Sequence, residues 1–299
     1  VFSDSDALRV RSVSSRNRDL FAFGAAPRRH VPKRTQTISQ LPAVPSRAEG
    51  SEDGVLSPEV YQSIYTRAAT KSQTSSSDDS FESSTPWDIG GPQPTIRKSY
   101  QAGDFYGRVL DCGCGAGENA VYLAQQQLLQ SSLASSTSLP EITGVVGFDL
   151  VPEAIDTART RAIAAEVPNG FLQFHALSCD EIDVPGSPLR DQPKFDVAID
   201  SALLHCLSDT IAQTYVAQLS QLLKPHTGRV FVGCFNDLNP EAGWSNPRRL
   251  SEGYLRELFC EERGFEIVDL REVWWDRPSV RGSNMGSCCM AYWMEARRL

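Results

Sequence analysis

Apolar patterns typical of strands and of helices alternate along the chain from Arg108 almost to its end. Strands are expected over residues 108–112, 144–149, 171–175, 195–201, 229–235, 265–274 and 289–297. Helices are expected over residues 118–130, 152–166, 209–224 and 251–263. Alternating strands and helices form parallel sheets with right-handed crossovers, whereas no helix separates the last two strands. The sequence therefore predicts an α/β fold with a doubly wound, mostly parallel seven-stranded sheet and an antiparallel last strand.

The N-terminal part of the 299-residue chain differs in composition from the rest. Residues 1–48 contain nine Lys and Arg against three acidic residues, whereas the remaining residues contain 20 against 34. We expect a disordered basic extension over 1–57, a partly helical segment with a Ser-rich linker over 58–85, and one domain over 86–299. The extension is either a targeting peptide for a plastid or mitochondrion, or a disordered tail of a cytoplasmic protein. A further Ser-rich stretch, residues 131–138, predicts a surface insertion.

The composition of the domain argues against several kinds of partner. Its excess of acidic residues opposes binding to nucleic acid, and the chain has no run of 18 apolar residues that could span a membrane. Six of the eight cysteines lie in or beside expected strands and helices, no C-x-x-C pair occurs, and Cys112 and Cys114 are too close together for ordinary zinc spacing. We therefore expect free thiols, no metal and a reducing compartment. We also expect a monomer.

The segment VLDCGCGAG, residues 109–117, ends an expected strand and opens an expected helix. Its glycines, Gly113, Gly115 and Gly117, allow the backbone to turn tightly and to approach a ligand closely. Loops of this kind bind nucleotides in Rossmann-like folds. We therefore expect a nucleotide-type ligand at this loop.

Charge distinguishes between the nucleotides that such a loop binds. A dinucleotide fingerprint would place its third glycine at position 118, where this chain has Glu118, and a carboxylate there repels a pyrophosphate. Asp111 and Glu118 better suit a cationic ligand such as S-adenosylmethionine, which carries an ammonium and a sulfonium group and no phosphate. Asp149, at the end of the second expected strand, can accept hydrogen bonds from ribose hydroxyls. An NAD-dependent oxidoreductase is disfavoured.

Over about residues 86–299 the chain resembles the class I S-adenosylmethionine-dependent methyltransferases. The segments that carry this resemblance are PWDIGGPQP at 86–94, GAGENA at 115–120 and DVAIDS at 196–201. The first is similar to the segment that precedes the fold in the thiopurine, thiol and halide methyltransferase group. Within that group the chain is closest to small bacterial members that methylate heterocyclic toxins and hydroxyquinolines.

The resemblance implies a set of cofactor-binding residues. The three loop glycines would line the methionine end, Asp149 would hold the ribose beside Leu150 at the adenine, and Trp87 would fold over the cofactor as a lid. The remaining expected members of the set are Asp111, Glu118, Asn119, Asp180 and Asp200. The group usually has an acidic residue for the adenine amino group near the end of the third strand, where this chain has His175. Asp180 or a backbone carbonyl is the substitute, and an alternative for Trp87 is packing on the sheet edge.

Methyl transfer from a sulfonium is an in-line displacement, so the protein mainly has to align the reactants and exclude water. Thiols and acidic phenols ionise near neutral pH, whereas a less acidic hydroxyl needs a base. His205 is the candidate base, and a capping or core histidine is the alternative. Asp200 is expected to orient the substrate or the histidine.

The C-terminal third supplies large aromatic residues for a substrate pocket, namely Trp244, Trp274, Trp275, Tyr292 and Trp293. Aromatic walls favour flat apolar substrates and the sulfonium cation. Trp274 and Trp293 are nevertheless expected to point into the core from adjacent strands. Arg248 and Arg249 either meet an anionic substrate or, more commonly for such a pair, lie in solvent.

These features predict methyl transfer to S, O or N of a small aromatic, heterocyclic or thiol acceptor, with halide transfer as a variant. The alternatives are a catalytically silent protein that binds the cofactor and interacts with partners, and the disfavoured oxidoreductase.

Overall fold

The computed structural model describes residues 55–74, 85–132, 139–168, 170–239, 246–277 and 288–299. Most of the predicted extension over 1–57 and of the predicted insertion over 131–138 lies outside the described residues, as do residues 75–84 and Trp244, and the predictions made for them stay predictions. Residues 131 and 132 are helical, so the insertion does not begin at residue 131. Within the described residues, no helix combines the length and apolar character that a membrane span requires.

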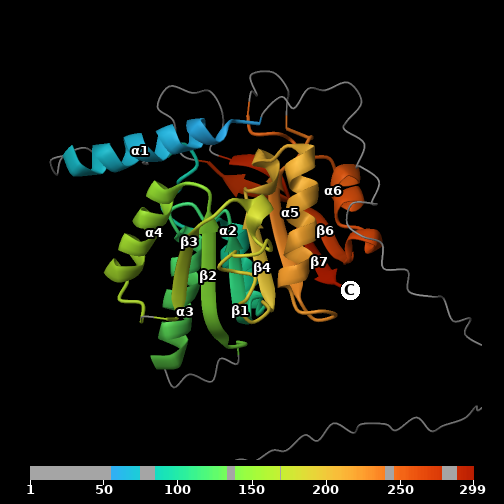
Figure 1. The fold of residues 1–299 in the computed structure, drawn as a ribbon, viewed down its shortest axis with the longest axis horizontal. Coiled ribbons are helices and arrows are strands. Elements are labelled where there is room, and N and C mark those ends of the chain that lie inside the picture. Colours follow the sequence, from blue (N-terminus) through green and yellow to red (C-terminus); the bar gives the residue numbers. More distant parts are fainter. Residues whose placement is uncertain (1–54, 75–84, 133–138, 169, 240–245, 278–287) are drawn as a thin grey trace, which may run out of the picture. The chain divides into compact units, whose positions relative to one another are not determined.

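One sheet of seven strands lies at the centre of the domain (Figure 1). The strands are β1 (Gly107–Cys112), β2 (Ile142–Asp149), β3 (Leu172–Ala176), β4 (Val197–Ser201), β5 (Arg229–Phe235), β6 (Phe265–Asp276) and β7 (Cys288–Arg298). Their order is β3-β2-β1-β4-β5-β7-β6. The first five strands pair in parallel, whereas β7 runs antiparallel to both β5 and β6. The predicted Rossmann-like α/β sheet with an antiparallel last strand is confirmed.

Six α-helices occur in the described residues: α1 (Pro58–Thr74), α2 (Pro94–Ala102), α3 (Glu118–Ser132), α4 (Pro152–Ala164), α5 (Asp209–Leu222) and α6 (Glu252–Leu258). Ser208 and Ser251 cap α5 and α6 by accepting hydrogen bonds from backbone N–H groups of the first turn. The helix predicted over 251–263 is wrong in its second half. It ends at Leu258 because the backbone at Cys260 is extended, and a separate short turn then runs to Gly264, which has φ +85°.

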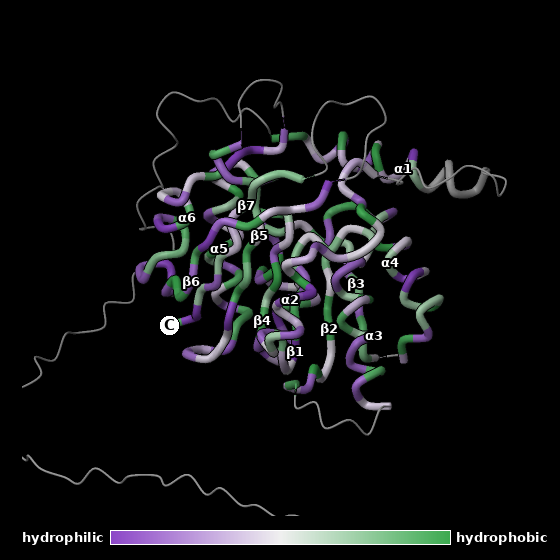
Figure 2. Tube along the Cα trace, turned by 180° about the vertical axis from the view of Figure 1, so that it is seen from behind, coloured by the Kyte–Doolittle hydropathy of each residue, from purple (hydrophilic) through white to green (hydrophobic). Residues whose placement is uncertain are grey.

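Helices cover both faces of the sheet, and hydrophobic residues follow the strands between them (Figure 2). On one face α2, α3 and α4 contribute Ile96, Leu123 and Ile155 to a buried cluster. On the other face α5 and α6 contribute Tyr215 and Leu255. All eight cysteines are free thiols, and four of the six expected near strands and helices are fully buried while Cys206 and Cys260 are partly buried.

The aromatic residues of β6 and β7 differ in part from expectation. Trp293 is buried at 1% exposure, as predicted, and stacks on Phe231. Trp274 is wrong as a core residue, because 63% of its surface is exposed. Successive residues of a strand face opposite sides of the sheet, and it is Trp275, at 2% exposure, that faces inward.

Candidate functional site

The glycine loop lies where the strand order reverses, between β1 and β4. In open α/β sheets, ligands bind beyond the carboxyl ends of the strands at this point. Gly113 has φ +62°, and a Cβ there would lie 2.8 Å from Leu203 in the segment after β4. A Cβ on Gly117, with φ +83°, would lie 2.9 Å from Ala158 of α4. Both positions therefore need glycine for conformation and for close packing.

Asp111 fixes the start of α3. Its Oδ2 accepts a hydrogen bond from the backbone N–H of Ala120 (3.1 Å), and its Oδ1 accepts one from the side-chain amide of Asn119 (3.4 Å). The carboxyl group has no exposed surface, and burial raises its pKa to about 7. The contacts of Asp111 and Asn119 thus shape the loop that would surround a ligand.

Asp149 connects the end of β2 to the same loop. Its Oδ2 accepts the backbone N–H of Gly115 (2.9 Å), and its Oδ1 accepts that of Val151 (2.9 Å). Each carboxylate oxygen has a further lone pair, so Asp149 can still accept hydrogen bonds from ligand hydroxyls. The adjacent Leu150 is 44% exposed and offers an apolar surface at the same edge.

Glu118 is not a free carboxylate. It forms an ion pair with Arg161 of α4, which also pairs with Asp88 (3.4 Å) and donates to the carbonyl oxygen of Ala116 (3.3 Å). The guanidinium compensates the charge of Glu118, so the repulsion of phosphate is weaker than the sequence suggested. Arg161 instead joins the segment around Asp88 to the glycine loop.

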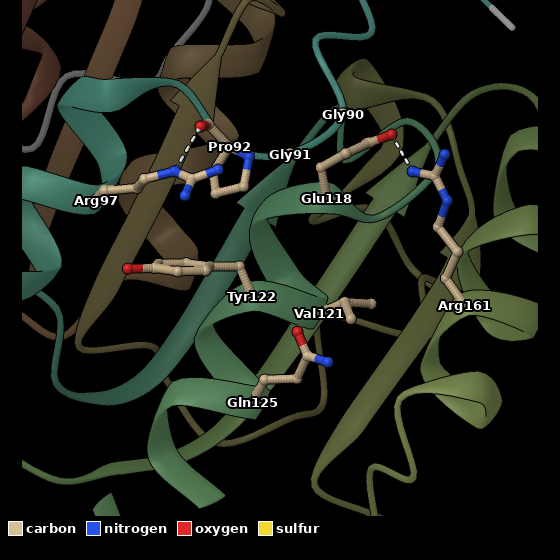
Figure 3. A pocket seen from close by; sticks show the side chains of 9 residues that line it. All are labelled: Gly90, Gly91, Pro92, Arg97, Glu118, Val121, Tyr122, Gln125 and Arg161. Carbon is tan, nitrogen blue, oxygen red and sulfur yellow. Dashed lines mark hydrogen bonds and ion pairs between the residues drawn. The ribbon is translucent and has the colours of Figure 1, made fainter. Parts of the chain in front are cut away.

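Beside this ion pair lies a groove of about 400 Å³, drawn in Figure 3. Glu118 and Arg161 point toward each other on one side, and Arg97 lies near Tyr122 on the other. The guanidinium of Arg97 is 5.7 Å from the centre of the Tyr122 ring and donates to the carbonyl oxygen of Pro92 (3.2 Å). Both guanidinium groups that line this groove are therefore already engaged by the protein.

Two tyrosines of α1 lie over the loop together with Trp87. The hydroxyl of Tyr65 is 2.7 Å from the place that a Cβ on Gly115 would take, and it accepts a hydrogen bond from the Trp87 indole N–H (3.3 Å). Tyr61 and Tyr65 have ring centres 6.0 and 5.6 Å from that of Trp87. Burial and a hydrogen bond with Cys206 raise the pKa of Tyr61. Helix α1 and Trp87 thus cover the carboxyl ends of β1 and β2.

His175 and Asp180, the two residues considered for the adenine position, lie in different parts of the fold. His175 lies within β3 opposite Phe148, and its Nε2 is buried without a hydrogen-bond partner among the described residues. Asp180 lies in the short turn beyond the end of β3 and accepts a hydrogen bond from the Ser178 hydroxyl. Asp180 is therefore the one of the two that lies beyond the strand end.

Asp200 is fully buried and holds the turn that follows β4. Its Oδ1 accepts the backbone N–H groups of Leu203 (3.0 Å) and Leu204 (3.1 Å). Burial raises its pKa to about 7, and the Tyr215 hydroxyl lies beside it. In this turn Ala202 has φ +81°, a value that residues other than glycine rarely adopt. Asp200 thus fixes the backbone of the turn that carries His205, and its expected role in orienting the substrate or the histidine stays a prediction.

His205 lies in that turn and is 2% exposed. Its Nδ1 accepts the backbone N–H of Phe235 (3.0 Å), and its ring stacks on the Phe235 ring at 4.7 Å. The ring of Trp275 approaches edge-on at 6.4 Å. Burial, followed by the nearby charge of Arg248, lowers the pKa of His205 to about 3. These surroundings favour the core-histidine alternative over a base.

The two arginines of this region are bound within the protein. Arg248 pairs with Asp209 (2.6 Å) and donates to the carbonyl oxygen of Leu207, and its side chain is only 14% exposed. Arg249 donates to the carbonyl oxygen of Asn239. Solvation, the expected common fate of this pair, is therefore wrong for Arg248, because Asp209 at the start of α5 holds its guanidinium.

Gln93 joins the segment after Trp87 to the end of β6. Its side-chain N–H donates to the carbonyl oxygen of Asp276 (3.0 Å), and its carbonyl oxygen accepts the backbone N–H of Asp276 (3.0 Å). The amide thus replaces a neighbouring strand at the edge of the sheet, next to Trp275. One side chain thereby connects the segment that carries Trp87 to the residue after Trp275.

Replacing Gln93 with leucine is expected to remove both hydrogen bonds and to loosen the end of β6. Because the bonds are exposed, we expect a small loss of stability, about 1 kcal/mol, and a several-fold rise in the KM of an acceptor. Thermal melting and steady-state kinetics measure the two effects. Gln101→Leu, at an exposed position of α2, is the matched control and is expected to change neither. Equal melting temperatures and equal KM values in the two variants would contradict the role of Gln93 as a bridge to β6.

A family model described as a methyltransferase domain matches residues 110–230. This range contains the glycine loop, Asp149 and Asp200. By this match, residues 110–230 are similar to a methyltransferase domain. The domain is 28% identical over 173 residues to the 2-heptyl-1-hydroxyquinolin-4(1H)-one methyltransferase of Mycobacteroides abscessus, an alignment that covers 58% of this chain and 66% of that protein. This chain thus spans just under two thirds of the length of that relative.

Solved structures resemble the methyltransferase domain in fold. One, solved in work on the conversion of a disulfide bond into a thioacetal group during echinomycin biosynthesis, has a TM-score of 0.58 at 25% identity and covers 80% of this chain and 91% of its own. A second, an S-adenosylmethionine-dependent methyltransferase from Anabaena variabilis, has a TM-score of 0.56 at 13% identity and covers 83% and 97%.

Sequence reasoning missed several residues of the site: Tyr61, Tyr65, Gln93 as a bridge, and Arg161. The tyrosines are four residues apart and share one face of a helix, so their spacing was an available signal. Gln93 and Arg161 left no such signal, since their partners lie 183 and 43 residues away along the chain.

Proposed function

We propose that the protein transfers the methyl group of S-adenosylmethionine to an oxygen, sulfur or nitrogen atom of a small, flat heteroaromatic or thiol acceptor. The observation that carries the proposal is an arrangement at one edge of the sheet. The glycine loop and Asp149 lie at the ends of β1 and β2, and an aromatic wall of Phe235 and Trp275 lies across β4. The hydroxyquinolone substrate in the name of the Mycobacteroides abscessus relative supports a flat acceptor.

In this proposal Asp149 accepts hydrogen bonds from the ribose hydroxyls, and Leu150 packs on the adenine. The three loop glycines lie against the methionine part, and Asp180 receives the adenine amino group in place of His175. Asp111 and Asn119 act through the loop that they hold in place. Arg161 compensates part of the charge of Glu118. The preference of the site for a cationic ligand therefore depends on Asp111 and Asp149 in addition to Glu118.

We also propose membership of the thiopurine, thiol and halide methyltransferase group, based on the segment 86–94. Trp87 is then the cover of the cofactor, supported by its contacts with Tyr61 and Tyr65 above the loop. A monomeric state and a domain boundary near residue 86 remain predictions that belong to the same proposal.

The experiment is turnover of methyl-labelled S-adenosylmethionine with a panel of thiols, phenols, hydroxyquinolines and halides. We expect formation of S-adenosylhomocysteine with at least one acceptor class. Calorimetry with S-adenosylmethionine and NAD is carried out in parallel, and binding of the former alone is expected. Cofactor binding without turnover on the whole panel would instead favour the silent interaction protein, and NAD binding would restore the oxidoreductase.

A further inference from the structure

The ring of His205 is held in one orientation from several sides. Asp200 fixes the preceding turn through the N–H groups of Leu203 and Leu204. Phe235 stacks on one ring face with an interplanar angle of 13°, and Trp275 approaches edge-on. The Nδ1 atom accepts the backbone N–H of Phe235 at 3.0 Å. The ring therefore has a defined direction for each of its two nitrogens.

The hydrogen bond at Nδ1 determines where the proton of the neutral ring resides. A ring nitrogen that accepts a hydrogen bond uses its lone pair and therefore carries no hydrogen. The neutral imidazole must then carry its proton on Nε2. The ring is neutral because it is buried beside the cation Arg248, which is paired with Asp209. Among the described residues, the side-chain hydrogen bond that His205 makes is the one at Nδ1. His205 thus presents a free N–H donor beside the aromatic wall.

This tautomer conflicts with a general base. Nε2 already holds its proton, and Nδ1 has its lone pair occupied by the Phe235 N–H. Removing a proton from an acceptor at either nitrogen would require a charged ring in a buried site or the loss of that bond.

We propose that His205 binds the acceptor as a hydrogen-bond donor through Nε2–H, and that the acceptor enters the site already ionised. This inference rests on the proposed function and specifies its substrate class. The acceptor is a flat heteroaromatic compound whose hydroxyl or thiol ionises near neutral pH. An anionic oxygen or sulfur accepts the charge-assisted hydrogen bond, and the rings of Phe235 and Trp275, which both contact the His205 ring, provide the aromatic surface beside it.

The reaction balances without a protein base. The acceptor loses its proton to solvent before it binds, and its lone pair forms the new bond to the methyl carbon. The bond between that carbon and the sulfonium breaks, and its electron pair neutralises the sulfur. The products are S-adenosylhomocysteine and the methylated acceptor, and His205 keeps its proton throughout.

The first test reads the tautomer directly in the full chain labelled with ¹⁵N-histidine. Long-range ¹H–¹⁵N spectra distinguish the two neutral tautomers and the protonated ring. The chain has four histidines, and the signals of His205 are assigned by their loss in His205→Gln. We expect the His205 ring to be neutral, with its proton on Nε2, from pH 5 to 9. Burial and the charge of Arg248 both oppose protonation, and they are expected to outweigh the nearby Asp200 carboxyl group. A protonated ring within that range, or an Nδ1–H tautomer, would overturn the proposal.

The second test compares two variants that separate the donor from the Nδ1 contact. The amide of His205→Gln can place an N–H near the original Nε2, whereas His205→Asn can satisfy the Phe235 N–H but reaches no farther. Both variants are measured with a series of hydroxyquinolines of graded acidity. We expect His205→Asn to lower kcat/KM about 10- to 100-fold, by a similar factor for each acceptor, and His205→Gln to retain much of the wild-type value. The affinity for S-adenosylhomocysteine is expected to be unchanged.

Two results contradict this expectation. A loss that grows as the acceptor becomes less acidic is the behaviour of a missing base, and equal losses in Gln and Asn indicate a merely structural ring. If the wild-type protein turns over none of the acceptors, the proposed function fails. The tautomer measured by ¹⁵N spectroscopy remains readable in that case, so the two failures are distinguishable.

Discussion

Replacing Asp149 with alanine is expected to weaken the binding of S-adenosylmethionine and S-adenosylhomocysteine by about 10- to 100-fold. The variant loses the proposed acceptor of the ribose hydroxyls, a charged partner worth about 1–3 kcal/mol. It also frees the N–H groups of Gly115 and Val151, which hold the glycine loop against β2. Isothermal titration calorimetry below the melting temperature measures the effect.

Two comparisons interpret that measurement. Asp149→Asn keeps one carbonyl oxygen and is expected to give an intermediate affinity. Asp156→Ala removes an exposed carboxylate of α4 whose ion pair among the described residues is with Arg159 in the same helix, and it is expected to bind normally. An Asp149→Ala protein with wild-type affinity would refute the assignment of the ribose site.

Replacing Gly233 with alanine is expected to destabilise the protein and to disturb the aromatic wall. A Cβ on Gly233 would overlap the six-membered ring of Trp275, with Cη2 at 2.9 Å, and would lie 3.2 Å from Trp293. Both indoles are at least 98% buried, so a displaced ring would have to push against its neighbours. Overpacking of this kind costs about 1–3 kcal/mol, and each kcal/mol lowers the Tm of such a domain by about 2–4 °C.

The matched control is Gly144→Ala, another strand glycine. Its nearest neighbour is the Phe171 carbonyl oxygen at 3.5 Å, an ordinary contact distance. Circular dichroism melting is expected to separate the two variants by several degrees, and the KM of an acceptor is expected to rise only for Gly233→Ala. Identical melting temperatures would show that Trp275 is not fixed as the structure indicates.

The architecture could be predicted because it depends on local patterns. Apolar runs indicated each strand of the sheet. The lack of an expected helix between the last two strands predicted their antiparallel pairing. Errors arose where packing decides between equivalent local choices. The sequence offered Trp274 and Trp275 as adjacent candidates for the core, and the register of β6 against β7 selected Trp275.

The candidate site shows the same division. The glycine loop and Asp149 were recognisable because their role depends on position at the end of a strand. The charge of Glu118 was misjudged because its partner Arg161 lies on another helix. The placement of His205 in a turn after β4 was visible, but its hydrogen bond to Phe235 was not, since the two residues meet only when β4 and β5 pair.

The sequence by itself determined the α/β class, the nucleotide loop and the residues at the strand ends, because these follow from periodicity and from the conformational needs of glycine. The tertiary structure alone decided which charges are compensated, which of the two adjacent indoles is buried and which nitrogen of His205 accepts a hydrogen bond. Those properties depend on burial and on partners far away in the chain, and electrostatic energies change most steeply where water is excluded.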